Sequence, residues 1–269
     1  MESSACLSCS ISHLNEDNMD LERRCRPLLG TYVEIGVDKH VEAIESAFAS
    51  IEKVQKLMSF HQHDSDLSRI NQSSSGQSLQ VDPWTWSVLK RAIEMYHNTR
   101  GAFDCAIQGD LSDIHLCKHN IVRIDDSVLL DLGGIAKGFA VDQAIETLQL
   151  SGVDQAIVNA GGDLRVYGDD PRLITVRDPN RPSGVIPAGY LTCGSIATSA
   201  PYFSYQQNAS NETCALMNPF TRLSICDLKS YSVIAPNCMD ADALTKALAV
   251  HQNPDADYFK IYKAHALLQ

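Results

Sequence analysis

The residues with the clearest chemistry lie in one stretch of the chain, residues 130–168. Two glycine pairs, Gly133-Gly134 and Gly161-Gly162, flank a segment that carries Lys137 and Asp142. Paired glycines let a ligand approach the backbone closely. A helix that begins behind the first pair offers unpaired N–H groups and the positive end of its dipole. With Lys137 in the first turn, the pattern predicts a site for a nucleotide phosphate. Simple tight turns remain the alternative for either pair taken alone.

The elements that position this site follow from the apolar residues around it. A helix is predicted from about Ala136 to just before Gly152, because apolar residues recur there at helical spacing and glycine suits the position past a helix end. Apolar runs predict strands at residues 127–132 and 156–158, and the extended pattern resumes at 164–167. The glycines fit neither G-x-G-x-x-G nor G-x-x-x-x-G-K-[ST], which excludes the usual dinucleotide and phosphate-loop patterns.

Elements farther along the chain follow from similar patterns. An alternating run predicts one strand over residues 26–37, and Asp38 is expected to cap a helix that ends near Met58. Asp82-Pro83 predicts the start of a second helix that runs to about Asn98. We further expect a loop at 72–80, strands at 173–178 and 189–198, and a terminal strand or helix at 255–268.

Composition excludes some classes of function. The formal net charge of −11 argues against a nucleic-acid-binding surface, which needs a basic face. No run approaches the ~18 apolar residues of a membrane span. The nine cysteines lack paired zinc spacing and are expected to be reduced. Because the amino-terminal segment lacks the pattern of an export signal, we expect a cytoplasmic protein with a disordered tail at 1–20 and one domain at 21–269.

The stretch DLGGIAKGFAVD, followed by VNAGGDLR, resembles the ApbE family. These are flavin transferases that move FMN from FAD onto a threonine of a target protein. Similar matches occur at residues 99–104 (TRGAFD), 195–200 (SIATSA) and 241–248 (ADALTKAL). The resemblance implies a single α+β domain with mixed sheets and packed helices, and FAD as the substrate. It implies FAD contacts at Leu29, Ser59, Phe60, Phe103, Asp104, Gly134, Ala136, Lys137, Asp142, Asn159, Gly161, Gly162, Thr198 and Ser199.

The resemblance also implies a charged centre for the FAD diphosphate. Its catalytic residues would be Asp242, Lys246 and Lys137, and the family's Mg²⁺ would contact Ala136 and Asp242. Lys246 stands where the family has a threonine, one helical turn from Asp242. Either Mg²⁺ or the Lys246 ammonium could therefore neutralise the diphosphate. The same spacing also fits a plain salt bridge.

One segment departs from the family. Ala215 stands where the family has a histidine near the reacting phosphate, and Asn218 where it has an aspartate. A group that transfers a proton contributes about 10²–10⁴ in rate. Two functions therefore stay open. The first is an FAD:protein FMN transferase that modifies a threonine or serine of an acceptor protein and releases AMP. The second is an FAD-binding homologue without transfer, either a carrier or a slow FAD pyrophosphatase.

Overall fold

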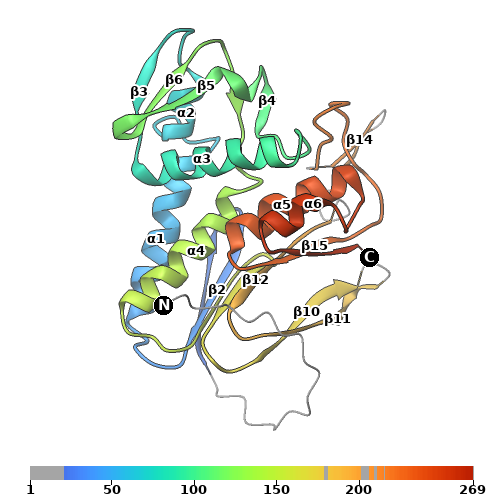
Figure 1. The fold of residues 1–269 in the computed structure, drawn as a ribbon. Coiled ribbons are helices and arrows are strands. Elements are labelled where there is room, and N and C mark those ends of the chain that lie inside the picture. The colour runs from blue at the N-terminus through green and yellow to red at the C-terminus, as the bar shows by residue number, and fades with distance from the viewer. Residues whose placement is uncertain (1–20, 179–180, 201–205, 209–210, 215, 269) are drawn as a thin grey trace.

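A seven-stranded sheet forms the centre of the molecule (Figure 1). The structure is a computed structural model that describes residues 21–178, 181–200, 206–208, 211–214 and 216–268, so the predicted tail at 1–20 lies outside it. Every neighbouring pair of strands in this sheet is antiparallel. In order across the sheet, the strands are β1 (Glu22–Leu28), β2 (Thr31–Val37), β8 (Ala156–Ala160), β9 (Asp163–Tyr167), β12 (Gly194–Ser199), β15 (Tyr231–Ala235) and β16 (His265–Leu268).

The two faces of this sheet are covered differently. Helices α4 (Ala136–Leu150) and α5 (Cys238–His251) pack on one face, and α1 (Ala43–Met58) lies beside α4. The hairpin of β10 (Arg172–Asp178) and β11 (Arg181–Leu191) packs on the other face through a separate apolar cluster. Alternation along each strand produces this division, since successive side chains point to opposite faces. Thus Ala197 joins the helical core, whereas its neighbour Ile196 joins the hairpin cluster.

A smaller lobe sits at one end of the helical layer (Figure 1). It holds α2 (Asp66–Asn71), α3 (Pro83–Asn98) and the short strands of two small sheets. One sheet has the order β3 (Ser78–Gln80), β6 (Ile121–Ile124), β5 (Ile114–Cys117), and the other pairs β4 (Ala106–Gln108) with β7 (Leu129–Leu130). The remaining elements are α6 (Asp257–Ile261), a hairpin of β13 (Gln206–Asn208) and β14 (Asn211–Thr213), and 3₁₀ turns at Leu111–Asp113 and Lys118–Asn120.

Most predicted elements around the glycine pairs are confirmed. Helix α4 begins at Ala136, and Gly152 follows its end with a left-handed φ of 81°. Asp82 caps α3 by accepting the Trp84 N–H at 2.9 Å. The segment at 72–80 ends in β3, and the terminal segment contains both a helix, α6, and a strand, β16. The predicted strand at 127–132 shortens to β7, and the one at 189–198 divides between β11 and β12.

Two predictions near the amino terminus are wrong. Residues 26–37 do not form one strand but the hairpin β1–β2, which turns at Leu29 and Gly30 with φ of 55° and 71°. A two-residue hairpin loop of this kind needs positive φ at both positions. Leucine is not a residue that indicates positive φ, so the sequence pattern did not reveal the turn. Asp38 does not cap α1, which begins at Ala43. Its carboxylate instead accepts the Gln155 N–H at 3.0 Å.

Helices α4 and α5 cap each other. Asp142 on α4 accepts the N–H groups of Cys238 and Met239 in the first turn of α5, at 2.9 and 2.8 Å. Asp242 on α5 accepts the Gly138 N–H in the first turn of α4, at 3.0 Å. Each carboxylate therefore satisfies N–H groups that a helix cannot satisfy itself. The helices can approach this closely only because residue 138 is a glycine: an added Cβ would lie 2.3 Å from the Cys238 carbonyl oxygen.

Substitution Gly138→Ala tests this contact. Helix propensity alone would favour alanine by about 1 kcal/mol. The clash with a backbone oxygen should outweigh this gain and lower the free energy of unfolding by about 1–3 kcal/mol. Gln149→Ala, at an exposed site on the same helix, serves as the control and should leave stability within about 0.5 kcal/mol. Urea denaturation measures both. A Gly138→Ala variant as stable as the control would contradict the close packing of α4 on α5.

Candidate active site

Two adjoining cavities open between the smaller lobe and the helical layer. Their volumes are about 660 Å³ and about 490 Å³, and Ile107, Asp131, Gly133 and Lys137 line both. Each volume lies in the range of known small-molecule pockets. We call the two together the cleft, and Lys137 stands where its halves meet.

The cleft brings together most of the residues singled out in the sequence. The first cavity is lined by Leu29, Ser59, Phe60, Ala136 and Lys137. The second is lined by Phe103, Asp104, Gly134, Lys137, Thr198, Ser199 and Lys246. These residues come from segments far apart in the sequence.

Local contacts hold several of these residues in place. The Leu29 N–H donates to Gln55 Oε1 of α1 at 2.6 Å, which fixes the β1–β2 turn at the first cavity. The Gly133 N–H donates to Asp131 Oδ1 at 2.8 Å in front of α4. In the second cavity, the Ser199 hydroxyl lies 2.7 Å from that of Thr245 on α5.

The other predicted contact residues, Asn159, Gly161, Gly162 and Asp142, are not among the residues that line the cleft. Asn159 and the second glycine pair form the β8–β9 turn: Asn159 Oδ1 accepts the Gly162 N–H at 2.9 Å. Gly161 and Gly162 have φ of 61° and 104°, and a Cβ on Gly161 would lie 2.5 Å from Thr31 Oγ1. The second glycine pair therefore forms a tight turn, which the sequence analysis gave as the alternative to a phosphate site. It also places Asp163, the next residue, beneath the cleft.

The side chain of Asp142 makes contacts within the protein that hold two helices together. Besides the two α5 N–H groups, it accepts a hydrogen bond from Arg165 Nη1 at 2.6 Å. Burial raises the pKa of Asp142, and Arg165 with the N–H groups of Cys238 and Met239 offsets part of that rise. Its role as an FAD contact stays a prediction, whereas these contacts assign it a role in holding α5 against α4.

Four charges form the centre of the site. Lys137 pairs with Asp163, and Lys246 pairs with Asp242. The carboxylates are almost fully buried, with side chains 2% and 0% exposed, whereas the lysine side chains are 27% and 23% exposed. The positive charges therefore face the cleft and the negative charges lie behind them.

The pKa values of this centre follow from burial and from neighbouring charges. Burial lowers the pKa of Lys137, and Lys246 lowers it further, while Asp242 acts in the opposite direction. Burial acts to raise the pKa of Asp242, but Lys246, Lys137 and the Gly138 N–H together hold it below its ordinary value. Ionised Asp242 therefore contributes stability at neutral pH, which is lost only as pH falls through that lowered pKa.

The residues present do not fit the magnesium ion that the family resemblance implies. Mg²⁺ requires a near-octahedral set of oxygen ligands. Asp242 Oδ2 already accepts the Gly138 N–H, and Oδ1 bears the Lys246 ammonium. Within the described parts of the chain, no group of three His, Cys, Asp or Glu side chains could hold a metal ion. Ala136 borders the first cavity and remains a predicted ligand only.

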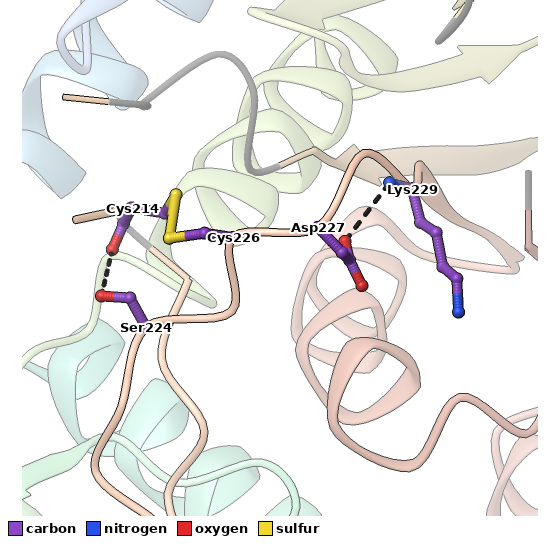
Figure 2. The surroundings of a disulfide bond; sticks show 5 residues. All are labelled: Cys214, Ser224, Cys226, Asp227 and Lys229. Atoms are coloured by element: carbon purple, nitrogen blue, oxygen red, sulfur yellow. Dashed lines mark hydrogen bonds between the residues drawn. A yellow bond between two sulfur atoms is a disulfide. The ribbon is translucent and has the colours of Figure 1, made fainter. Parts of the chain in front are cut away.

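The loop after β14 forms one wall of the second cavity. Leu216, Met217 and Pro219 line it, and Ala215 lies outside the described residues. A disulfide joins Cys214 to Cys226, with Cα atoms 5.8 Å apart (Figure 2). The prediction that all cysteines are reduced is therefore wrong for this pair, whose spacing in sequence gave no signal of their proximity.

Contacts on either side of the disulfide define the path of this loop. The Ser224 hydroxyl donates to the Cys214 carbonyl at 3.2 Å, and the Lys229 N–H donates to Asp227 at 3.3 Å (Figure 2). Arg222 Nη1 reaches the smaller lobe and donates to the Ala106 carbonyl at 2.7 Å. The loop thus contacts the smaller lobe through Arg222 and the end of α5 through Phe220, whose ring stacks on that of His251.

Comparison with known proteins identifies the family to which the chain belongs. The model of the ApbE family matches residues 29–112 and 107–264, and the chain belongs to this family. The FAD:protein FMN transferase of Treponema pallidum is 26% identical over 257 residues, which cover 77% of this chain and 71% of that protein. The FAD:protein FMN transferase of Vibrio cholerae is 27% identical over 240 residues, covering 74% and 70%.

Solved structures share the fold. The ApbE protein of Thermotoga maritima superposes with a TM-score of 0.81 at 25% identity, over 92% of this chain and 94% of that one. The flavinyl transferase ApbE of Pseudomonas stutzeri, in its apo form, gives a TM-score of 0.79 at 16% identity, over 95% and 96%. The α+β, ApbE-type architecture expected from the sequence is confirmed. Among the helices described, none is both long and apolar enough to cross a membrane.

Substitution Asp142→Ala separates a structural role from a ligand contact. It removes an acceptor from two helix N–H groups and leaves Arg165 without this partner, so the free energy of unfolding should fall by about 3 kcal/mol. Asp154→Ala breaks an exposed pair with Lys39 and should leave the free energy of unfolding close to that of the wild type. Urea denaturation and FAD titration are measured on both. Unchanged stability with weakened FAD binding would show that Asp142 is a ligand contact instead.

Proposed function

We propose that this chain is an FAD:protein FMN transferase, which transfers FMN from FAD to an acceptor protein and releases AMP. The observation that carries the proposal is the pair of ammonium groups that line the second cavity, Lys137 where it joins the first cavity and Lys246 within it. A diphosphate at that junction would have one half of FAD on each side. The names of the similar Treponema and Vibrio proteins support the same reaction.

The reaction requires stabilisation of charge on the diphosphate. An acceptor hydroxyl attacks the phosphorus on the FMN side, the new O–P bond forms, and the bond to the AMP phosphate breaks. Lys137 and Lys246 would bind the oxygens that gain charge, as cationic groups do in phosphoryl transfer generally. Thr198 and Ser199 line the same cavity, and the Ser199 hydroxyl, on the side of α5, could orient the phosphate.

Asp104 is our candidate for the group that accepts the proton of the attacking hydroxyl. It lines the second cavity together with Lys246, and its side chain is 10% exposed. Burial raises the pKa of Asp104, although the Ala106 N–H and Arg222 act in the opposite direction. A raised pKa suits a carboxylate that must take up a proton.

The acceptor must supply a hydroxyl, because the phosphoester that retains FMN forms from a hydroxyl. We propose a threonine or serine of a protein as this acceptor. We further propose one catalytic domain at 21–269. For the diphosphate, the contacts of Asp242 favour Lys246 over Mg²⁺.

The proposal is tested by incubating the protein with FAD, with and without a flavin-acceptor domain that contains a target threonine. AMP is measured by chromatography and bound flavin by fluorescence of the denatured acceptor. We expect AMP and covalent flavin in equal amounts. FAD binding without AMP would favour a carrier, and AMP and FMN without covalent flavin would favour a pyrophosphatase. Either result would contradict the transferase.

The role of Asp104 predicts a specific loss. Asp104→Asn should lower the transfer rate by about 10²–10⁴-fold and change FAD affinity less than the rate. The wild-type rate should rise with pH through a pKa above the ordinary aspartate value, because the ionised carboxylate is the active form. Asp126→Asn, at an exposed site, is the control. A normal rate for Asp104→Asn, or a flat pH profile, would exclude this role.

A further inference from the structure

The cation beside Asp242 is part of the chain. Lys246 lies one turn after Asp242 on α5, and its ammonium contacts the Asp242 carboxylate and also donates to the Asp242 carbonyl oxygen at 3.0 Å. Its stem packs over the first glycine pair, where a Cβ on Gly134 would lie 3.4 Å from Lys246 Cε. Two contacts with one residue and the packed stem fix the ammonium at the cleft.

The oxygen atoms around this ammonium are already engaged. The Thr245 hydroxyl donates to the Asp242 carbonyl at 2.7 Å and lies 2.7 Å from the Ser199 hydroxyl. The Asp242 carboxylate is shared between Lys246 and the Gly138 N–H. A divalent ion would have to displace the ammonium from its carboxylate, and it would then remain close to two other positive charges, Lys246 and Lys137.

The arrangement leaves donors for an anion. An ammonium has three N–H donors, and Lys246 uses two of them on Asp242. Lys137 lines the same cavity and pairs with Asp163. Because both lysine side chains are more exposed than their carboxylate partners, the remaining donors can reach a ligand in the cleft. Phosphate oxygens are the ligands that such a pair of ammonium groups binds best.

We propose that Lys246 is a permanent replacement for a divalent cation, so that this chain binds the diphosphate of FAD without any metal. The inference rests on the proposed function for the identity of the ligand. It predicts that FAD affinity is independent of divalent metal, and that the transfer reaction proceeds in the presence of a chelator. It also predicts that removing the ammonium frees Asp242 to bind a metal ion.

The first experiment measures FAD affinity by isothermal titration, in EDTA and in excess Mg²⁺. The wild-type dissociation constant should agree within twofold between the two conditions. Lys246→Thr should bind FAD at least tenfold more weakly in EDTA and regain part of the affinity in Mg²⁺. Lys260→Thr removes an exposed lysine on α6 and should behave as the wild type. A wild-type affinity that falls tenfold in EDTA would overturn the inference.

The second experiment measures metal binding directly and does not depend on FAD. Mn²⁺ is titrated into the protein, and free Mn²⁺ is read by electron paramagnetic resonance. The wild type should bind no stoichiometric Mn²⁺, and stoichiometric binding would overturn the inference. Thermal melting of each variant identifies any that fail to fold. As a further control, Lys246→Arg keeps the positive charge and should therefore retain FAD binding in EDTA.

The two proposals fail in different ways. Tight FAD binding in EDTA without AMP release would support the built-in cation and contradict the transferase. AMP release that requires Mg²⁺ would support the transferase and contradict the built-in cation. Absence of FAD binding in both conditions would contradict both, because no diphosphate would then be held between Lys137 and Lys246.

Discussion

The site depends on the exchange of capping carboxylates between α4 and α5. Asp142 of α4 caps α5, and Asp242 of α5 caps α4. Unpaired N–H groups buried at this crossing would each cost about 1–3 kcal/mol. Gly138 allows the crossing, since any side chain there would meet the Cys238 carbonyl. One contact therefore fixes how the two helices meet, with Lys137 in the first turn of α4 and Lys246 farther along α5, one turn after Asp242.

The same contact explains the charge of the cleft. A buried carboxylate needs a partner of opposite charge or hydrogen bonds to remain ionised. Asp242 has both, and the amine that supplies the charge extends into the second cavity. Asp163, set by the β8–β9 turn, pairs with Lys137 in the same way. The cations that stabilise the fold are thus the cations that a diphosphate would meet, within a protein whose net charge is −11.

The sequence predicts the parts of this site that depend on local patterns. Helix α4 with Gly152 behind it, and Lys137 at its start, were accessible from spacing and turn chemistry. Most of the residues that the motifs identified line the cleft. Other features depend on tertiary contacts and were missed. The pairing of Asp163 with Lys137 was not predicted, because the preceding glycine pair drew the interpretation. The capping role of Asp142 depends on α5, almost a hundred residues away in the sequence. Neither the positive φ of Leu29 nor the proximity of Cys214 to Cys226 could be predicted from the spacing of residues in the sequence.

The central claim is that one fixed ammonium, held by a capping carboxylate, occupies the place of a metal ion. The most direct measurement is a crystal structure of the wild-type protein soaked with FAD and MgCl₂. The account predicts the Lys246 ammonium between Asp242 and a diphosphate oxygen, with no metal on that carboxylate. A hydrated metal ion bound to Asp242, with Lys246 turned toward solvent, would contradict it.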